Sequence, residues 1–472
     1  MDTDITQQPP GSPSSDTLRT GGVEADTSPA LVTPATFRSV LAQPAIRALW
    51  IASLISYVGD AFGALALFVL VNGSTHSTLA LAGLGITQTL PLFLGVGAGV
   101  LVDRWRYRPV LLATDLIRAA LVPLYLLFPH TADLWLVLLV ALAVSLAARF
   151  FRPASQALRR ALLQPAEYAI AASLWQATVG LSYVVGPALA GLTIGLFGSA
   201  GVTVALFVDS LSFVLSAAIL FFGVRTAAQT IDAARTAQPH PSAWTDLREG
   251  WAFMWQSRPI RGVLLLYGVG LLGVGAVFVL VVPYVQRLFG GGALQVGLLD
   301  AGQAFGLALG AIGVGTLALR RFAAGDLLLA AAAVGGLAVV ALGLAPGYVV
   351  ALLAMLVAGA AAGTVESAGA AVTLHVVPQQ HQGKASATLD TLLNAAYVAS
   401  ITLAGLGGDT IGIRWVFVAG GVVAVLGALA AVPLLRGLIP PAQEPLPSPA
   451  SDLNPDSLPG GQAGIEEVMP IP

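Results

Sequence analysis

The sequence predicts an all-α membrane protein with twelve transmembrane helices arranged as two six-helix halves. Of its 472 residues, 56% are hydrophobic and only 10% are charged, and the mean hydropathy is +0.83. A soluble domain carries about 25% charged residues, so this much apolar surface needs lipid around it. The apolar residues are also gathered into separate stretches of the length that a bilayer requires, about 20 residues in a helix.

These apolar stretches give the expected spans in chain order. They lie at 48–71, 78–102, 109–128, 133–151, 168–197, 200–223, 260–285, 293–319, 325–345, 347–374, 385–408 and 413–436. Several are longer than a bilayer needs, which permits tilt.

Basic residues in the connecting loops set the expected orientation. Loops on one side of the predicted spans carry 15 Arg and Lys residues between Arg104 and Lys384, whereas the other side carries only Arg287 and Arg414. Loops rich in Arg and Lys face the cytoplasm. Both termini are therefore expected in the cytoplasm, which requires an even number of spans such as twelve.

Polar segments divide the chain into five expected parts. Both ends are rich in Pro, Ser, Gly and acidic residues and poor in aromatics, which is typical of disorder. In the longest polar interruption, the tryptophans from Trp244 to Trp255 recur at helical spacing and predict an interfacial helix or one packed on the bundle. The parts are a disordered cytoplasmic tail 1–36, a six-helix bundle 37–224, a cytoplasmic central loop 225–259, a six-helix bundle 260–439 and a disordered cytoplasmic tail 440–472.

Several classes of function are excluded by what the sequence lacks. There is no cysteine, no Walker loop, no G-x-S-x-G and no H-E-x-x-H, and the histidines are dispersed. We therefore expect no enzyme, no metal site and no cofactor, with a proton gradient as the energy source. The arginines form no single patch, so nucleic acid is not an expected partner. A monomer in the lipid bilayer is expected.

One short loop carries a recognisable motif. Gly99, Asp103, Arg104 and Arg108 join the second and third apolar stretches. They resemble the G-x-x-x-D-R-x-x-R/K-R loop between helices 2 and 3 of the major facilitator superfamily. The resemblance implies that this loop gates the cytoplasmic side; otherwise its charges only set the topology. Asp115 and Arg118, at i, i+3, are expected to neutralise each other as a structural bridge that can couple to the loop.

The fifth span carries a second motif. Gly186, Pro187 and Gly191 resemble, in part, the antiporter motif of superfamily exporters, with Ala190 in place of a glycine. Arg149 and Arg152, and the segment from Leu247 to Arg261, resemble the branch of macrolide-efflux permeases and the enterobactin exporter. The resemblance implies export across the cytoplasmic (inner) membrane of a bacterium.

Acidic residues inside the expected spans are candidates for proton or substrate transfer, because a charge within the hydrocarbon is costly and is usually functional or paired. Asp60 is near the middle of the first span, with no base nearby in sequence. Glu366 is the only Glu inside a span. The resemblance places both spans at the central cavity. Burial disfavours the charged form, so a proton could bind and leave near neutral pH. A hydrogen-bonded structural role is the alternative for each.

The other intramembrane acids allow two interpretations. Asp209 must point inward or pair, and a structural role is favoured. Asp300 with Gln303, and Asp390 with Asn394, either line the second half's side of the cavity or bond one helix to another.

Together these residues predict a proton-coupled antiporter that exports amphiphilic organic solutes, such as drug-like compounds or siderophores, by alternating access. The alternatives are an uptake permease for a small neutral solute and a non-transporting membrane sensor. Organic anions are disfavoured as cargo, because Arg118 is the only arginine in the interior of a predicted span, away from its ends.

Overall fold

The computed structural model describes residues 36–94, 105–127, 133–224, 257–314, 318–377 and 379–439, together with the single positions 102 and 255. Every regular element in this part of the chain is a helix. The structure thus confirms the all-α class expected from the apolar stretches.

The helices of the first half pack mainly with one another. Pairs in contact include α2 with α7 and α8, and α5 with α6 and α8. The elements are α1 (Phe37–Ala42), α2 (Pro44–Thr75), α3 (Thr78–Thr89) with its 3₁₀ continuation Leu90–Leu94, α5 (Tyr107–Leu121) with its continuation Val122–Leu127, α6 (Leu134–Leu162), α7 (Tyr168–Phe197) and α8 (Ser199–Gly223).

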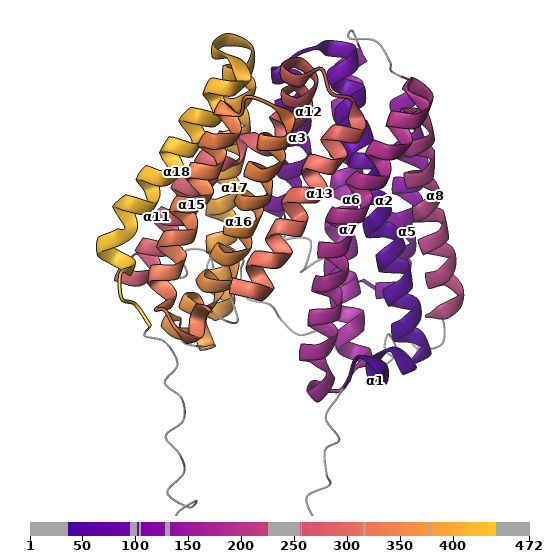
Figure 1. Ribbon diagram of the computed structural model, residues 1–472. Helices are drawn as coiled ribbons and strands as arrows, with labels where there is room; N and C mark the ends of the chain where they lie inside the picture. The colour runs from indigo at the N-terminus through magenta and orange to yellow at the C-terminus, as the bar shows by residue number, and fades with distance from the viewer. Residues whose placement is uncertain are drawn as a thin grey trace, which may run out of the picture.

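The helices of the second half form a matching group, salmon to yellow in Figure 1. α15 packs against α16 and α18, and α13 packs against α16. The elements are α11 (Arg258–Val274), α12 (Ala276–Phe289), α13 (Ala293–Leu309) with the π-turn Gly310–Val314, α15 (Ala324–Leu344), α16 (Tyr348–Val376), α17 (Gln379–Gly407), the π-turn Gly408–Gly412 and α18 (Ile413–Leu435).

Every predicted span overlaps helix in the described part of the chain. By length and hydropathy, ten stretches there qualify as membrane spans. One of them, Thr388–Leu435, joins most of α17 to α18, and Thr78–Phe93 is apolar but shorter. The span expected at 260–285 is interrupted at Gly275, between α11 and α12. The twelve-helix count itself stays a prediction.

Both ends of the described chain lie at the same end of the molecule. α1 and the C-terminal end of α18 are at the bottom of Figure 1, and we call this the termini side and the opposite end the far side. The two halves meet on the far side through direct contacts of α7 with α13 and of α3 with α17.

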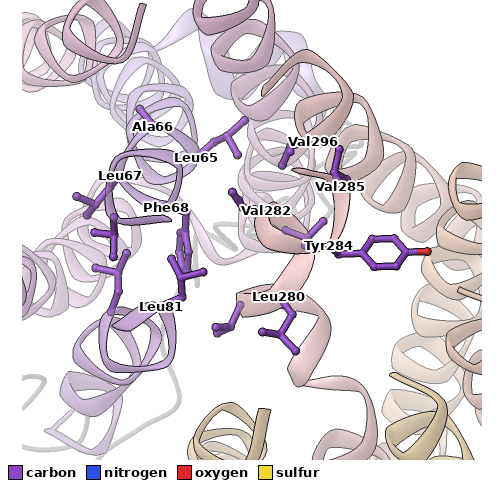
Figure 2. Packing of buried hydrophobic residues seen from close by; sticks show 14 of the residues in the cluster. Leu65, Ala66, Leu67, Phe68, Leu81, Leu280, Val282, Tyr284, Val285 and Val296 are labelled. Atoms are coloured by element: carbon purple, nitrogen blue, oxygen red, sulfur yellow. The ribbon is translucent and has the colours of Figure 1, made fainter. Parts of the chain in front are cut away.

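The buried apolar residues show where the two halves are joined. The largest cluster mixes residues of both halves, including Leu65 and Phe68 of α2 with Val282 of α12 and Val296 of α13. Figure 2 shows these side chains facing one another across the junction. On the termini side, one cluster contains only first-half residues and two others contain only second-half residues. The shared core therefore closes the far side.

A tight turn joins α2 to α3 on the far side. α2 ends at Thr75, and the next residue, His76, has a left-handed backbone (φ 50°) and donates its N–H to the Asn72 carbonyl. Ser77 then caps α3 by accepting from the Ala80 N–H. A side chain at the helix N-terminus satisfies one of the free backbone donors, so α3 begins sharply at this point.

Several predictions lie outside the described residues. They concern the two tails, most of the central loop with its interfacial helix, and Gly99, Asp103 and Arg104 of the loop motif. The proposed domain boundaries also stay predictions.

Candidate functional site: a charge cluster in a central cavity

A cavity of about 430 Å³ lies between the halves and is lined mainly by the first half. α2, α5, α6, α7 and α8 contribute most of its wall. The second half contributes Phe278 of α12 and Tyr397 of α17. Asp60, Arg118 and Asp209 all line it. The structure thus places the predicted acid of the first span at a central opening.

Arg118 of α5 is the centre of a buried network. Its guanidinium donates to the Asp60 carboxylate at 3.0 Å, to the Asp115 carboxylate at 2.5 Å and to the Ser56 hydroxyl at 3.3 Å. The ring centres of Phe213 and Phe151 lie 4.1 and 5.1 Å from the Arg118 Cζ. Planar, charged and rich in donors, a guanidinium can satisfy several acceptors at once and still stack on aromatic rings.

The two acids that Arg118 contacts differ in their exposure. Asp115 is fully buried and also accepts a hydrogen bond from the Ser216 hydroxyl at 2.6 Å. The Asp60 side chain is 40% exposed, while that of Arg118 is only 2% exposed. Asp60 is therefore the member of the network that water or solute in the cavity can reach. Asp115 is the anchored member, and the predicted Asp115–Arg118 bridge is confirmed.

Asp60 differs from the expectation in one respect. The sequence shows no base near Asp60, whereas the structure pairs it with Arg118. The two residues are 58 positions apart and meet only because α2 and α5 face each other across the fold. Consequently a proton on Asp60 competes directly with an ion pair.

Asp209 of α8 is the unpartnered acid of the cluster. It is 6% exposed, and its Oδ1 has no hydrogen-bond partner among the described residues. Its side chain lies against the backbone of Gly63, and Ser212 lies against that of Gly59. A Cβ at either glycine would collide with them, so α2 needs glycine here to admit the acid. The predicted inward orientation of Asp209 is confirmed.

Arg149 and Arg152 of α6 also line the cavity. Arg149 is close to the end of the fourth predicted span and Arg152 follows it, and organic anions are disfavoured from the sequence because only Arg118 lies in the interior of a span. That argument is wrong, since α6 continues as a regular helix to Leu162 and carries both arginines along the cavity wall. Their spacing of i, i+3 was the signal that could have shown this.

The remaining predicted pathway residues lie elsewhere. Glu366 is exposed on α16, and Asp390 is exposed on α17. Asp300, Gln303 and Asn394 are half-buried. They are not among the residues that line the central cavity, so the cluster in the first half is the stronger candidate.

Two motif predictions can be placed in part. Arg108 donates to the Phe221 carbonyl at 2.7 Å and its guanidinium lies 4.7 Å from the Phe221 ring, so it ties the start of α5 to the end of α8. In the second motif, Gly186 lies against Ala61 of α2, whereas Gly191 lies against α13. A Cβ on Gly191 would lie 2.6 Å from the Ala293 carbonyl and 3.1 Å from the Gly297 Cα.

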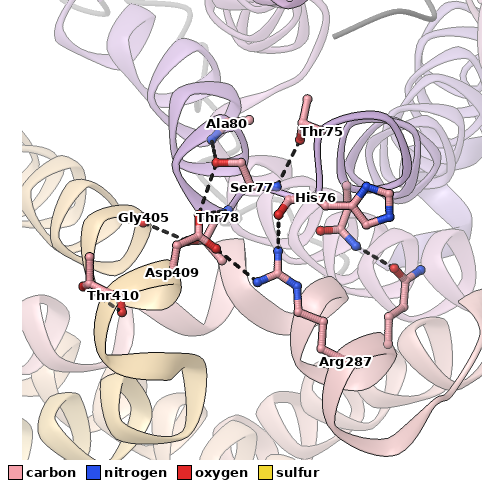
Figure 3. Close-up of polar contacts among 12 residues, drawn as sticks. Thr75, His76, Ser77, Thr78, Ala80, Arg287, Gly405, Asp409 and Thr410 are labelled. Atoms are coloured by element: carbon pink, nitrogen blue, oxygen red, sulfur yellow. Dashed lines mark hydrogen bonds and ion pairs between the residues drawn. The ribbon is translucent and has the colours of Figure 1, made fainter.

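A polar contact on the far side, absent from the sequence predictions, joins the two halves (Figure 3). Arg287 of α12 donates to the His76 carbonyl at 2.7 Å and to the Asp409 carboxylate at 3.1 Å. Asp409 also accepts from the Thr78 N–H at 2.8 Å and the Ser77 hydroxyl at 3.2 Å. We call these five residues the far-side lock. Asn72 and Gln286 add a hydrogen bond beside it at 2.6 Å.

Two helical halves meet around a central cavity that holds a charge cluster and is closed at one end, which is the architecture of a membrane transporter. The family described as transmembrane secretion effector matches residues 35–454. The chain therefore belongs to this family of the major facilitator superfamily.

Individual proteins agree with this assignment. The chain is 27% identical over 396 residues to the uncharacterized MFS-type transporter YfiS of Bacillus subtilis, covering 81% of this chain and 91% of that protein. It is 22% identical over 395 residues to macrolide efflux protein A of Streptococcus pyogenes, covering 81% and 93%. Among solved structures, a bacterial homologue of the iron transporter ferroportin gives a TM-score of 0.66 at 15% identity, covering 84% of this chain and 99% of that one. The nucleoside transporter NupG gives 0.65 at 14% identity, covering 83% and 98%.

Proposed function

We propose that the protein is a proton-coupled antiporter that exports amphiphilic organic solutes from the bacterial cytoplasm, as a monomer in the inner membrane and by alternating access. The termini side is the cytoplasmic side in this proposal. The observation that carries it is the cluster of three carboxylates, Asp60, Asp115 and Asp209, around the one guanidinium of Arg118.

The charge balance of the cluster calls for protons. Fully ionised, these four groups would carry two net negative charges in a region where Arg118, Asp115 and Asp209 are all buried. Uncompensated charge in a low-dielectric interior is costly, and a buried carboxyl group takes up a proton instead. Asp60 is the exposed acid of the cavity wall, so a proton on Asp60 can exchange with water there.

The wall of the cavity suits an amphiphilic solute. Tyr57, Tyr183, Phe278 and Tyr397 supply aromatic surface, and the charged cluster supplies polar contacts at one point. Binding sites for organic molecules commonly combine an apolar wall with a few placed polar groups. A solute that approaches Asp60 can displace its proton or its contact with Arg118, which links binding to proton release.

The direction of transport rests on the relatives and on charge. The family is described as a secretion effector, and one relative is named a macrolide efflux protein. The excess of arginines on the termini side favours the cytoplasm there. The shared core and the far-side lock close the opposite end, so the described conformation would admit solute from the cytoplasm.

Transport into inside-out membrane vesicles tests the proposal, with radiolabelled erythromycin as the probe. Acidifying the vesicle lumen should drive erythromycin inward, and a protonophore should abolish this uptake. Asp60→Asn should remove the component driven by the pH gradient, because an amide cannot carry the proton that the carboxylate exchanges. Asp326→Asn is the matched control, because Asp326 is exposed and only accepts the Gly437 N–H, which an amide oxygen can also do.

Uptake that is indifferent to the pH gradient would remove proton coupling. Unchanged gradient-driven uptake in Asp60→Asn, at equal expression, would remove Asp60 from the mechanism.

A further inference from the structure

A second cavity of about 540 Å³ adjoins the central one on the termini side. It lies between the C-terminal part of α6 and the N-terminal part of α7. Tyr57, Arg152 and Val179 line both cavities, so the two share a wall. We call the second cavity the vestibule. A solute that enters from the termini side would meet it before it reached Asp60.

Arginines of one helix dominate the charge of the vestibule. Arg152, Arg159 and Arg160 line it, and Arg149 extends the row into the central cavity. These positions are i, i+3, i+10 and i+11 on α6, which places them along one side of the helix. None of the ion pairs in the described part of the chain involves them, and no Asp or Glu lines the vestibule.

Two buried donors in the vestibule lack an acceptor. The Arg159 guanidinium stacks on the Trp175 ring, 4.3 Å from its centre. Within the described residues, the Arg159 Nε and the Trp175 Nε1 are both buried and have no hydrogen-bond partner. Trp175 itself is only 4% exposed. Nε of Arg149 is a third such donor in the same row. Buried donors nearly always have a hydrogen-bond partner. These unsatisfied donors therefore indicate that a bound ligand supplies the acceptor.

The rest of the vestibule wall is apolar and aromatic. Leu163, Ala171 and Val179 lie beside the rings of Tyr57 and Trp175. An inorganic anion would leave this surface unused. A molecule with an anionic group at the arginines and an apolar body along the wall would contact both.

We propose that the vestibule is a capture subsite for the anionic group of an amphiphilic solute, a carboxylate, phosphate or sulfate held by Arg152 and Arg159. Arginine forks bind such oxygens in pairs, which fixes the orientation of the bound group. The proposal rests on the proposed transport function and names its solute class. Two sources supply this chemistry: a soluble amphiphilic anion, and the headgroup of an anionic phospholipid in the adjoining leaflet.

Binding to the purified full-length protein tests the subsite, with 1-naphthyl phosphate as the probe and neutral 1-naphthol as its counterpart. The unmodified protein should bind the phosphate more tightly than the alcohol. Arg159→Gln and Arg152→Gln should each weaken phosphate binding about ten-fold or more and leave naphthol binding unchanged, since each removes a charged hydrogen-bond donor. Arg321→Gln is the matched control, because it removes an exposed arginine of the second half.

Trp175→Phe keeps the ring under Arg159 but removes the indole donor. It should weaken phosphate binding several-fold and keeps the test decisive if the arginine variants do not fold. Folded Arg159→Gln, Arg152→Gln and Trp175→Phe variants that all bind 1-naphthyl phosphate like the unmodified protein would overturn the subsite.

Binding in nanodiscs distinguishes a soluble anion from a lipid headgroup as the natural ligand. If the natural ligand is a lipid headgroup, phosphatidylglycerol discs should reduce 1-naphthyl phosphate binding relative to phosphatidylcholine discs, and Arg159→Gln should lose that difference. Equal binding in both discs indicates a soluble anion. Because binding is measured without transport, loss of proton coupling in vesicles would leave the subsite standing, while coupled transport with no arginine-dependent binding would overturn the subsite alone.

Discussion

Arg118 is the residue on which the charge cluster depends. It is the only base in contact with Asp60 and Asp115 within the described chain, and it is itself almost fully buried. Removing one partner of a buried ion pair leaves an uncompensated charge, which costs about 3–5 kcal/mol. Arg118→Gln should therefore lower the free energy of unfolding by that order, measured by denaturation in detergent.

Neutralising a partner provides the control for this change. The double variant Arg118→Gln/Asp115→Asn removes one acid together with the base, so it should recover a large part of the lost stability. If Arg118→Gln alone unfolds like the unmodified protein, the cluster does not hold the first half together.

The two buried acids of the cluster, Asp115 and Asp209, should respond differently to the same isosteric change. Asp115 accepts hydrogen bonds from Arg118 and Ser216, whereas Oδ1 of Asp209 has no partner. Hydrogen bonds to charged groups contribute about 1.5–3 kcal/mol each. Asp115→Asn should therefore destabilise the protein by about that amount, while Asp209→Asn should be neutral or stabilising. Thermal unfolding of the two variants in parallel measures the difference, and equal losses would contradict the assigned environments.

At the scale of the helix, glycines set how closely elements approach. On α7, a Cβ at Gly191 would meet the backbone of α13, whereas a Cβ at Gly180 would meet nothing within 4 Å. Overpacking costs about 1–3 kcal/mol, while replacing a helical glycine by alanine gains up to about 1 kcal/mol in helix propensity. Gly191→Ala should destabilise the closed far side, and Gly180→Ala should be neutral or stabilising.

Cysteine cross-linking measures this effect, because the chain has no native cysteine. A cysteine pair placed at Leu65 and Val296, in the shared core, should cross-link less readily in the Gly191→Ala background than in the Gly180→Ala background. Equal cross-linking in the two would show that α7 and α13 can separate without opening the junction.

The same scale shows what sequence reasoning reaches. The spans were predictable, because about 20 apolar residues in a row have one stable arrangement in lipid. The Asp115–Arg118 bridge was predictable, because i, i+3 residues are neighbours on any helix. The pairing of Asp60 with Arg118 was not predictable from one chain, because it depends on which helices face each other. Arg287 and Asp409 lie 122 positions apart and were missed for the same reason.

At the scale of the whole molecule, the far-side lock and the central cluster lie on opposite sides of one junction. The shared core supplies most of the contact there, but apolar contacts are non-directional. The lock adds polar contacts that exist only while His76, Ser77 and Thr78 of the first half sit beside Arg287 and Asp409 of the second. Such contacts can bias a rocking equilibrium between two states.

The lock should respond to pH. Asp409 lies in the turn between α17 and α18, outside the predicted spans. Partial burial alone would raise the pKa of Asp409, but the hydrogen bonds from Arg287, Thr78 and Ser77 outweigh it and hold the pKa below its ordinary value. A group with a lowered pKa stabilises the locked state fully above its ordinary pKa and loses that contribution as the pH falls through the lowered value. Acid on the far side should therefore favour opening.

Labelling of a single cysteine from the far side measures how readily the far side opens. Val282→Cys reports opening, because Val282 is 1% exposed in the shared core, and Gly73→Cys is the reference, because Gly73 is exposed at the end of α2. The ratio of their labelling rates cancels the direct effect of pH on the thiol. Partly exposed ion pairs contribute about 0.2–1 kcal/mol, so Asp409→Asn should raise the ratio by at most about five-fold at neutral pH. In the unmodified protein the ratio should rise as the pH falls below the ordinary range of an aspartate.

Asp409→Asn should also remove this dependence on pH, since it replaces the carboxylate of the lock, and His76 takes part in the lock through its backbone carbonyl. A ratio that still rises in acid in the variant would place the sensitive group elsewhere, with the Asp60 cluster as the next to test. That outcome separates two ways in which a proton gradient can act on one transporter. External acid can loosen the outer closure through Asp409, or it can reach the central carboxylates only after the closure has opened.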